Sequence, residues 1–193
     1  MLIAIEGIDG AGKSTLMQNL KKRLPSEKYT FCAEFQSPIG CVIKKLLKKH
    51  ATFFIKTYFF AADRAWTYKN IAKPEIEAGK TVIWDRYVDS ALAYRYAERD
   101  KADIIDFDFV KMINEPFEKA DITIYLKIPA EHSPERAQSA RRKELYEIDF
   151  LRNVEQYYDC LEKNNPSYHV IDAEKTAEEV TKEVLALLCE LKK

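Results

Sequence analysis

Short apolar runs alternate along this chain with longer segments in which apolar residues recur three or four positions apart. The short runs predict five buried β-strands, at residues 2–6, 29–33, 80–84, 122–128 and 168–171. The periodic segments predict helices at residues 13–24, 42–49, 53–78, 87–99, 107–119, 134–142, 150–163 and 177–191. Pro74 is expected to kink or restart the third of these helices, because proline cannot donate a backbone hydrogen bond.

Strands that alternate with helices in this way favour a parallel sheet covered by helices on both faces. Ligands of such open sheets bind at the carboxyl ends of the strands. No repeat, low-complexity tract or Pro/Ser-rich linker divides the sequence. We therefore expect an α/β fold with a five-stranded parallel sheet, formed by residues 1–193 as a single domain.

Composition narrows the class of protein further. The 31 Lys and Arg residues balance 31 Asp and Glu residues, which argues against a nucleic-acid coat or a membrane-surface protein. The four cysteines have no C-x-x-C spacing and suit free thiols in a reducing compartment. The N-terminus lacks a basic signal region, and the most apolar stretch, residues 52–62, is shorter than the roughly 20 residues of a membrane span. We expect a cytoplasmic protein that binds neither membrane nor nucleic acid.

Glycine supplies the first indication of chemistry, because three of the five glycines lie within residues 7–12. The segment Gly7-Ile8-Asp9-Gly10-Ala11-Gly12-Lys13-Ser14 satisfies G-x-x-x-x-G-K-[ST] between a predicted strand and a predicted helix. In such a loop the backbone N–H groups and the helix N-terminus surround a triphosphate. Lys13 is expected to reach the β- and γ-phosphates and the Ser14 hydroxyl to coordinate Mg²⁺. The alternative, a plain glycine turn, would require all these features to coincide by chance.

The sequence EGIDGAGKST together with WDRYVDSALAY, residues 84–94, resembles the thymidylate kinases among the P-loop nucleoside monophosphate kinases. The resemblance extends over nearly the whole chain and includes FFAADR at residues 59–64 and ELYEIDF at residues 144–150. It implies a P-loop NTPase fold with a helical lid at about residues 134–149. It also implies ATP- and Mg²⁺-dependent phosphorylation of dTMP to dTDP, a step of dTTP biosynthesis.

The resemblance assigns roles around the donor. Asp85 is expected to organise Mg²⁺ together with Ser14, and Arg86 to grip the acceptor phosphate, for which a planar guanidinium is well suited. An N-cap aspartate beside a surface arginine is the alternative for this pair. ATP is expected to contact the loop and the residues after it: Gly7, Ile8, Asp9, Gly10, Ala11, Gly12, Lys13, Ser14 and Thr15.

On the acceptor side, Phe60 and Arg64 are four residues apart and share one face of a helix. By resemblance Phe60 stacks on thymine and Arg64 hydrogen-bonds its edge, although Phe60 taken alone also fits a core residue. Asp9 matches a carboxylate that faces the acceptor sugar. Tyr94 matches an aromatic near the acceptor, with a packing role equally open. Glu34 matches the family carboxylate after the second strand.

The predicted lid is rich in arginine, which by pattern alone is typical of a solvated helix face. Some members of the family carry a loop arginine at the position of Gly10, and others supply it from the lid. Arg141 or Arg142 is therefore the expected catalytic arginine, and Arg136 matches a residue that stacks on adenine. Tyr146 is expected near the acceptor sugar, where an aromatic ring leaves little room for a 2′-hydroxyl.

One departure concerns Ala33-Glu34-Phe35, which has no arginine on either side of the carboxylate, although the family often has one there. The lysines near residues 44–49 fit a solvated helix face better than a replacement for the missing arginine.

A deoxynucleoside kinase is the first alternative function, with Glu34 as the base that a 5′-OH requires. A nucleotide-binding switch is the second, but the N-K-x-D guanine signature is absent. The resemblance and the aromatic residues of segment 53–66 also predict a homodimer.

Overall fold

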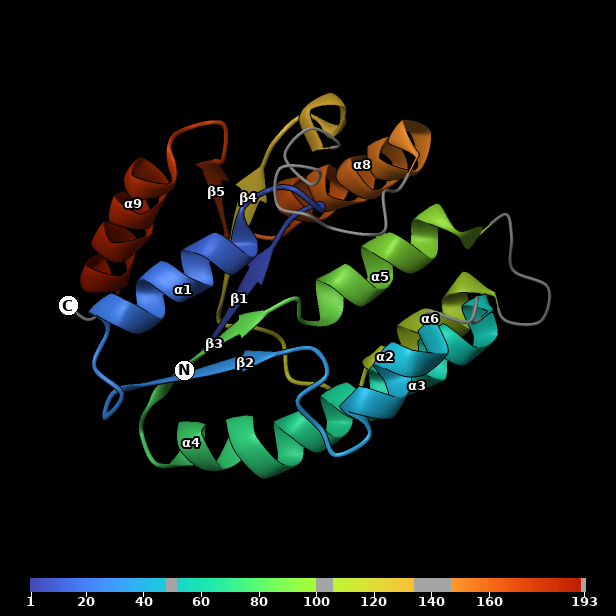
Figure 1. Ribbon diagram of the computed structural model, residues 1–193, viewed down its shortest axis with the longest axis horizontal. Helices are drawn as coiled ribbons and strands as arrows, with labels where there is room; N and C mark the ends of the chain where they lie inside the picture. The colour runs from blue at the N-terminus through green and yellow to red at the C-terminus, as the bar shows by residue number, and fades with distance from the viewer. Residues whose placement is uncertain (48–51, 100–105, 134–146, 192–193) are drawn as a thin grey trace.

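The computed structural model describes residues 1–47, 52–99, 106–133 and 147–191. Its centre is one parallel sheet with the strand order β2-β3-β1-β4-β5 (Figure 1). The strands are β1 (Leu2–Glu6), β2 (Tyr29–Ala33), β3 (Thr81–Asp85), β4 (Ile122–Lys127) and β5 (Tyr168–Asp172). All five lie where the apolar runs predict them, and the predicted parallel sheet is confirmed.

Helices cover the sheet and connect its strands (Figure 1). They are α1 (Lys13–Arg23), α2 (Gly40–Leu47), α3 (Phe53–Thr67), α4 (Lys73–Glu77), α5 (Val88–Ala97), α6 (Phe107–Asn114), α8 (Ile148–Asn164) and α9 (Ala177–Glu190). No helix in the described ranges is long and apolar enough to cross a bilayer.

The core lies on both faces of the sheet, because side chains alternate along each strand. Ile3 and Ile5 of β1 belong to a buried cluster that contains Leu16 of α1 and Val184 of α9. Leu2 and Ala4 belong to a second cluster, with Trp84, against which the segment between α3 and α4 packs. The expectation of helices on both faces is thereby confirmed.

The long helix predicted for residues 53–78 is divided into three parts. A π-helical turn, Tyr68–Ala72, separates α3 from α4, and the Lys73 N–H donates to Tyr68 O, five residues earlier. Pro74 follows at the start of α4. Since proline has no N–H and its ring clashes with the carbonyl four residues before it, the wider turn accommodates Pro74 without breaking the helical path.

Two other helix predictions differ from the structure. The helix predicted for residues 107–119 ends at Asn114, two residues before Pro116, which has no N–H to continue the helical hydrogen bonds. The helix predicted for residues 134–142, and most of the predicted lid, lie outside the described residues.

Candidate active site

The predicted phosphate loop joins the carboxyl end of β1 to the N-terminus of α1. Gly12 is the N-cap of α1, and Lys13 is its first residue. The Lys13 side chain is buried, and its Nζ donates to Gly7 O at 2.7 Å and to Ile8 O at 2.6 Å. Ser14 and Thr15 are exposed in the first turn. The loop therefore places an amine, a hydroxyl and a positive helix end around one concave backbone segment.

Gly10 packs against Ser133, which follows the 3₁₀ turn Ala130–His132. The Ser133 hydroxyl donates to Asp9 O at 2.6 Å, and a Cβ at Gly10 would lie 2.8 Å from Ser133 O. Gly10 also has a φ of +81°, which side chains other than glycine rarely adopt. An arginine could not replace Gly10 without moving the loop. The phosphate loop therefore has no positively charged side chain at position 10.

Three predicted residues meet beyond the end of β3. The Arg86 guanidinium pairs with Asp9 Oδ1, lies 3.5 Å from Gly7 O through Nη1, and has its Cζ 4.9 Å from the centre of the Tyr94 ring. Burial opposes the positive charge, but the oxygens of Tyr94, Asp9 and Glu34 outweigh it and raise the pKa of Arg86 above its ordinary value. Arg86 is therefore a permanently charged group beside the loop.

Asp85 lies at the same edge, paired in register with Ile5 of β1 and Ala33 of β2. Its Oδ1 is buried without a hydrogen-bond partner among the described residues. A buried carboxylate oxygen normally has a partner, so an unpaired one beside a phosphate loop fits a cation or its bound water. Oxygen ligands are those that Mg²⁺ prefers, usually with only one or two from protein, so Asp85 and Ser14 form a suitable donor set.

The predicted base-binding pair comes from α3. Arg64 is buried, donates through Nη1 to Asn114 Oδ1 at 2.5 Å, and has its Cζ 5.4 Å from the centre of the Phe117 ring. Burial lowers the pKa of Arg64, while Glu34 opposes that shift. Phe60 is half-buried, with its ring centre 5.6 Å from that of Phe35. The α6 residue Asn114, which orients Arg64, carries no local signal in the sequence and was missed.

The loop after β2 is held by Asp63, another residue missed from the sequence. The buried Asp63 carboxylate accepts hydrogen bonds from Phe35 N at 2.6 Å, Ser37 N at 3.1 Å and Ser37 Oγ at 2.5 Å. Phe35 adopts a φ of +65°, and its carbonyl oxygen would lie 2.3 Å from a Cβ at Gly40. Two backbone donors of the loop thus depend on one carboxylate of α3.

Phe35 follows Glu34, beside which the family resemblance led us to look for an arginine. Its ring contacts Phe60 and lies beneath Lys44, whose Nζ is 5.0 Å from the ring centre. Lys44, expected to be a solvated side chain, therefore makes a cation–π contact with this loop. An aromatic contact stands here in place of the expected guanidinium.

Glu34 precedes Phe35, and the charges of Arg86 and Arg64 both act on the pKa of its carboxyl. Burial raises the pKa of Glu34 to about 7, while Arg86 and then Arg64 act in the opposite direction. Near neutral pH this carboxyl is therefore present in both protonation states. It lies in the electrostatic neighbourhood of Arg86, Arg64 and Asp85, as expected for a residue at the acceptor side.

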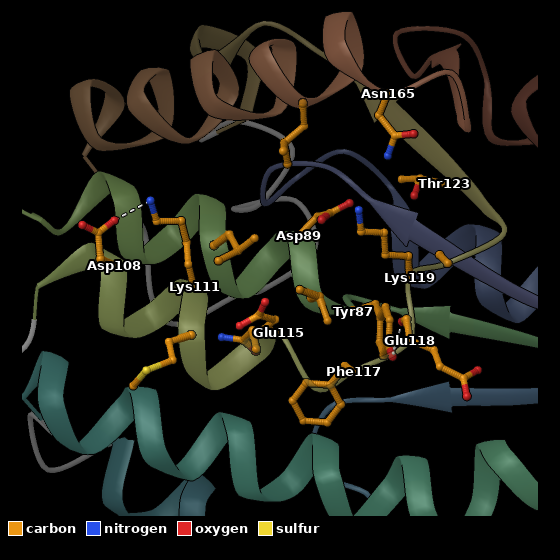
Figure 2. Close-up of a pocket in the computed structure, with 16 residues that line it drawn as sticks. Tyr87, Asp89, Asp108, Lys111, Glu115, Phe117, Glu118, Lys119, Thr123 and Asn165 are labelled. Carbon is orange, nitrogen blue, oxygen red and sulfur yellow. Dashed lines mark hydrogen bonds and ion pairs between the residues drawn. The ribbon is translucent and has the colours of Figure 1, made fainter.

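A separate cavity of about 660 Å³ lies among α5, α6, residues 115–120 and the end of α8. Figure 2 shows Asp89 and Lys119 extending into the same part of it, with Phe117 at one side. None of the predicted site residues in the described ranges lines this cavity. It lies behind the acceptor side, since Asn114 borders it and bonds Arg64.

The predicted residues thus form two groups. Around the loop lie Lys13, Ser14, Asp85, Asp9 and Arg86. Beside them, where the acceptor is expected, lie Phe60, Arg64 and Glu34. Tyr94 connects them through its contact with Arg86. Arg136, Arg141, Arg142 and Tyr146 lie outside the described residues.

Comparison with known proteins gives one consistent family. The family model described as thymidylate kinase matches residues 5–184. The chain is 36% identical over 189 residues to a probable thymidylate kinase of Pyrobaculum aerophilum, covering 96% of this chain and 95% of that protein. It is 33% identical over 199 residues to a thymidylate kinase of Halothermothrix orenii, covering 95% and 94%. With a family model that matches nearly the whole chain and relatives of this identity and coverage, the chain belongs to the thymidylate kinase family.

Proposed function

We propose that this protein transfers the γ-phosphoryl group of ATP to dTMP, forming ADP and dTDP in an Mg²⁺-dependent in-line reaction. The observation that carries the proposal is Arg86, a partly buried, permanently charged guanidinium that contacts Asp9 and Gly7 of the phosphate loop. A monophosphate acceptor is largely ionised at neutral pH. Its oxygen attacks the γ-phosphorus as the bond to the β-phosphate breaks, so the acceptor needs cations rather than a base.

On the donor side, the loop N–H groups and Lys13 would bind the β- and γ-phosphates. To do so, the Lys13 amine exchanges its bonds to Gly7 O and Ile8 O for phosphate oxygens. Asp85 and Ser14 would hold Mg²⁺, which neutralises charge on the phosphates when bound. Loop residues Gly7 to Thr15 would surround the triphosphate.

On the acceptor side, Phe60 would stack on thymine and Arg64 would hydrogen-bond the edge of the base. The bond from Arg64 to Asn114 supports this role, because it leaves the remaining guanidinium donors in a fixed direction. Asp9 would face the sugar, while Glu34 and Tyr94 would border the phosphate-binding arginine. The resemblance to the family supports these assignments residue by residue.

The lid would complete the site. Arg141 or Arg142 would supply the cation that Gly10 cannot, and Arg136 would stack on adenine. Tyr146 would lie near the acceptor sugar and favour deoxyribose. Closure of such a segment would exclude water and limit hydrolysis of ATP.

A nucleoside acceptor is the second candidate, because the Glu34 carboxyl, with its pKa of about 7, is suited to remove a proton from a 5′-OH. A steady-state assay with ATP, Mg²⁺ and a panel of thymidine, dTMP, dUMP and ribose TMP separates the two. We expect the highest kcat/KM for dTMP. Preferred turnover of thymidine, abolished in Glu34→Gln, would instead establish the nucleoside kinase.

We also propose that the protein acts in the cytoplasm as a homodimer. All four cysteines are free, as suits a reducing compartment. Helix α3 contacts both α2 and α6, and each of these three helices carries an exposed apolar side chain: Tyr58 on α3, Val42 on α2 and Met112 on α6. Figure 1 shows these helices side by side, and exposed apolar surface is typical of protein interfaces when it is extensive.

A further inference from the structure

Glu6 is a fully buried carboxyl directly before the phosphate loop. It is the last residue of β1, and its side chain has no exposed surface. Glu6 Oε1 accepts from Tyr87 N at 2.8 Å. Glu6 Oε2 contacts Ser90 Oγ at 2.5 Å and Tyr158 Oη at 2.8 Å. The carboxyl therefore joins β1 to the start of α5 and to α8.

The contacts around Oε2 form a closed triangle, because Ser90 Oγ and Tyr158 Oη are themselves 2.8 Å apart. Three oxygens at hydrogen-bonding distance from one another need three protons for three bonds. The two hydroxyl groups supply only two. If Glu6 carries the third proton, each oxygen donates to the next and every contact is a hydrogen bond. If Glu6 is ionised, two buried oxygens face each other without a proton.

The surroundings of Glu6 also favour the neutral form. Burial raises the pKa of Glu6, and the negative charge of Asp89 adds to that shift. Burial also raises the pKa of Asp89, but the hydrogen bond from Tyr168 acts in the opposite direction and favours the charged form of Asp89. Asp89 lines the cavity of Figure 2 and accepts from Tyr168 Oη at 2.6 Å. The charge of Glu6 also acts on Tyr158, Tyr168, Glu34 and Arg64. Tyr125 is opposite Glu6 in register on β4, and Arg86 contacts the Ser90 hydroxyl that also bonds Glu6.

We propose that Glu6 is a neutral positioning residue, which holds the turn bearing Arg86 while adding no negative charge to the acceptor site. Arg86 has a φ of +63°, a conformation that costs free energy in a residue with a side chain. Glu6 fastens this turn at two points, the N–H of Tyr87 and the hydroxyl of Ser90, and Ser90 Oγ also lies 3.5 Å from Arg86 Nη1. This inference rests on the proposed function only in that Arg86 acts on the acceptor phosphate.

The protonation state of Glu6 matters because a charge on Glu6 acts on the pKa of both Arg64 and Glu34. An ionised Glu6 would compete with the acceptor phosphate for positive charge and would open the hydrogen-bonded triangle. Glutamine reproduces the neutral arrangement, since its carbonyl accepts from Tyr87 N and its amide donates to both hydroxyl groups. Alanine removes every one of these contacts.

The protonation state is measured directly by NMR of the whole protein labelled with ¹³C at the glutamate side-chain carboxyl, with the Glu6 signal assigned by its loss in Glu6→Gln. We expect the chemical shift of a protonated carboxyl at neutral pH. The shift of an ionised carboxylate at neutral pH overturns the proposal. This readout requires no substrate, so it stands apart from any failure of dTMP phosphorylation.

Kinetics test the positioning role. In Glu6→Ala the KM for dTMP should rise about tenfold or more, with a much smaller change in the KM for ATP, and Glu6→Gln should rescue most of that loss. A glutamine variant no better than alanine overturns the proposal, as does an equal effect on both substrates. Should Glu6→Ala fail to fold, Tyr158→Phe replaces it and should raise the KM for dTMP in the same selective way. Tyr125→Phe is its matched control, because the Tyr125 hydroxyl bonds Asp159 rather than Glu6.

Discussion

At the residue scale, individual side chains of this site have more than one role. Lys13 Nζ donates to two carbonyl oxygens of its own loop, so the buried amine has hydrogen-bond partners in the absence of a ligand. In the proposed complex, phosphate oxygens would replace these partners. Arg86 is paired with Asp9 and makes a cation–π contact with Tyr94, and these two contacts hold the guanidinium in place without a ligand. Pre-oriented charges of this kind stabilise a transition state better than mobile ones.

Lys13→Ala should abolish most phosphoryl transfer. Lys13 is the residue of the loop expected to reach the β- and γ-phosphates, and removing one charged group from a developing charge commonly costs about 10²–10³ in rate. The measurement is kcat with saturating ATP and dTMP, with thermal unfolding as the check that the variant folds. More than a tenth of the wild-type kcat would show that the loop does not bind phosphate as proposed.

Arg86→Ala should raise the KM for dTMP far more than the KM for ATP. Hydrogen bonds to charged groups contribute roughly 1.5–3 kcal/mol each, which corresponds to a tenfold change or more in affinity. Alanine keeps a Cβ and therefore leaves the backbone at this positive φ under the same restriction as arginine. Arg86→Lys serves as the intermediate control, and equal changes for both substrates would contradict the assignment to the acceptor phosphate.

At the scale of elements, the proposed acceptor side combines helix α3 with Glu34 and Arg86, which follow the strands β2 and β3. Within the described residues, α3 provides Phe60 and Arg64 and also Asp63, whose carboxylate holds the loop after β2. In the proposed site the same helix would therefore both contact the base and hold the loop after β2. A shift of α3 would change both together.

Asp63→Ala should release this loop. The substitution leaves two loop N–H groups without their acceptor, so we expect the free energy of unfolding to fall by about 2 kcal/mol or more. The KM for dTMP should rise, because Phe35 then loses its fixed position against Phe60, while the KM for ATP should change little. Ser37→Ala removes only one of the three bonds and should have a smaller effect. Unchanged stability in Asp63→Ala would show that the loop is held by other contacts.

The lid gives a second prediction at this scale. The double variant Arg141→Ala/Arg142→Ala should lose about 10²–10³ in kcat with modest changes in either KM, because the cation is needed for the transition state. Tyr146→Ala should instead reduce the discrimination between dTMP and its ribose analogue. Normal turnover of the double variant would assign the catalytic charge to Lys13 and Arg86.

At the scale of the whole molecule, the exposed apolar side chains on α2, α3 and α6 are where we expect the interface of the proposed dimer. Met112 is 57% exposed, Val42 46% and Tyr58 44%. Sedimentation at micromolar concentration should show a dimer, and Tyr58→Glu should shift it toward monomer, because a charge is costly in a buried interface. Val170→Glu is the matched control, since Val170 is equally exposed but lies on the edge strand β5. Wild-type protein that sediments only as a monomer would refute the dimer.

Local patterns along the chain were sufficient for the architecture and for the phosphate loop. Strand and helix periodicity depend on neighbouring residues, and the loop needs eight consecutive ones, so both could be predicted from the sequence. An interruption of the helix at Pro74 was predicted too, but its form as a π-helical turn, with Ile71 and Ala72 packed at the sheet, is seen only in the structure. The Asp85-Arg86 pair was identified by its resemblance to a family motif of consecutive residues, and the roles of both residues stay predictions.

What the tertiary structure alone decided are the groups that hold the motifs in place. Glu6 and Tyr158 are 152 positions apart, and Arg64 and Asn114 are 50 apart, so no local pattern announces either contact. The same holds for protonation, because the pKa of Glu34 and of Glu6 depends on burial and on charges from several elements. Sequence determines which chemical groups are present in consecutive order; folding decides which of them lose water, meet a partner and keep or release a proton.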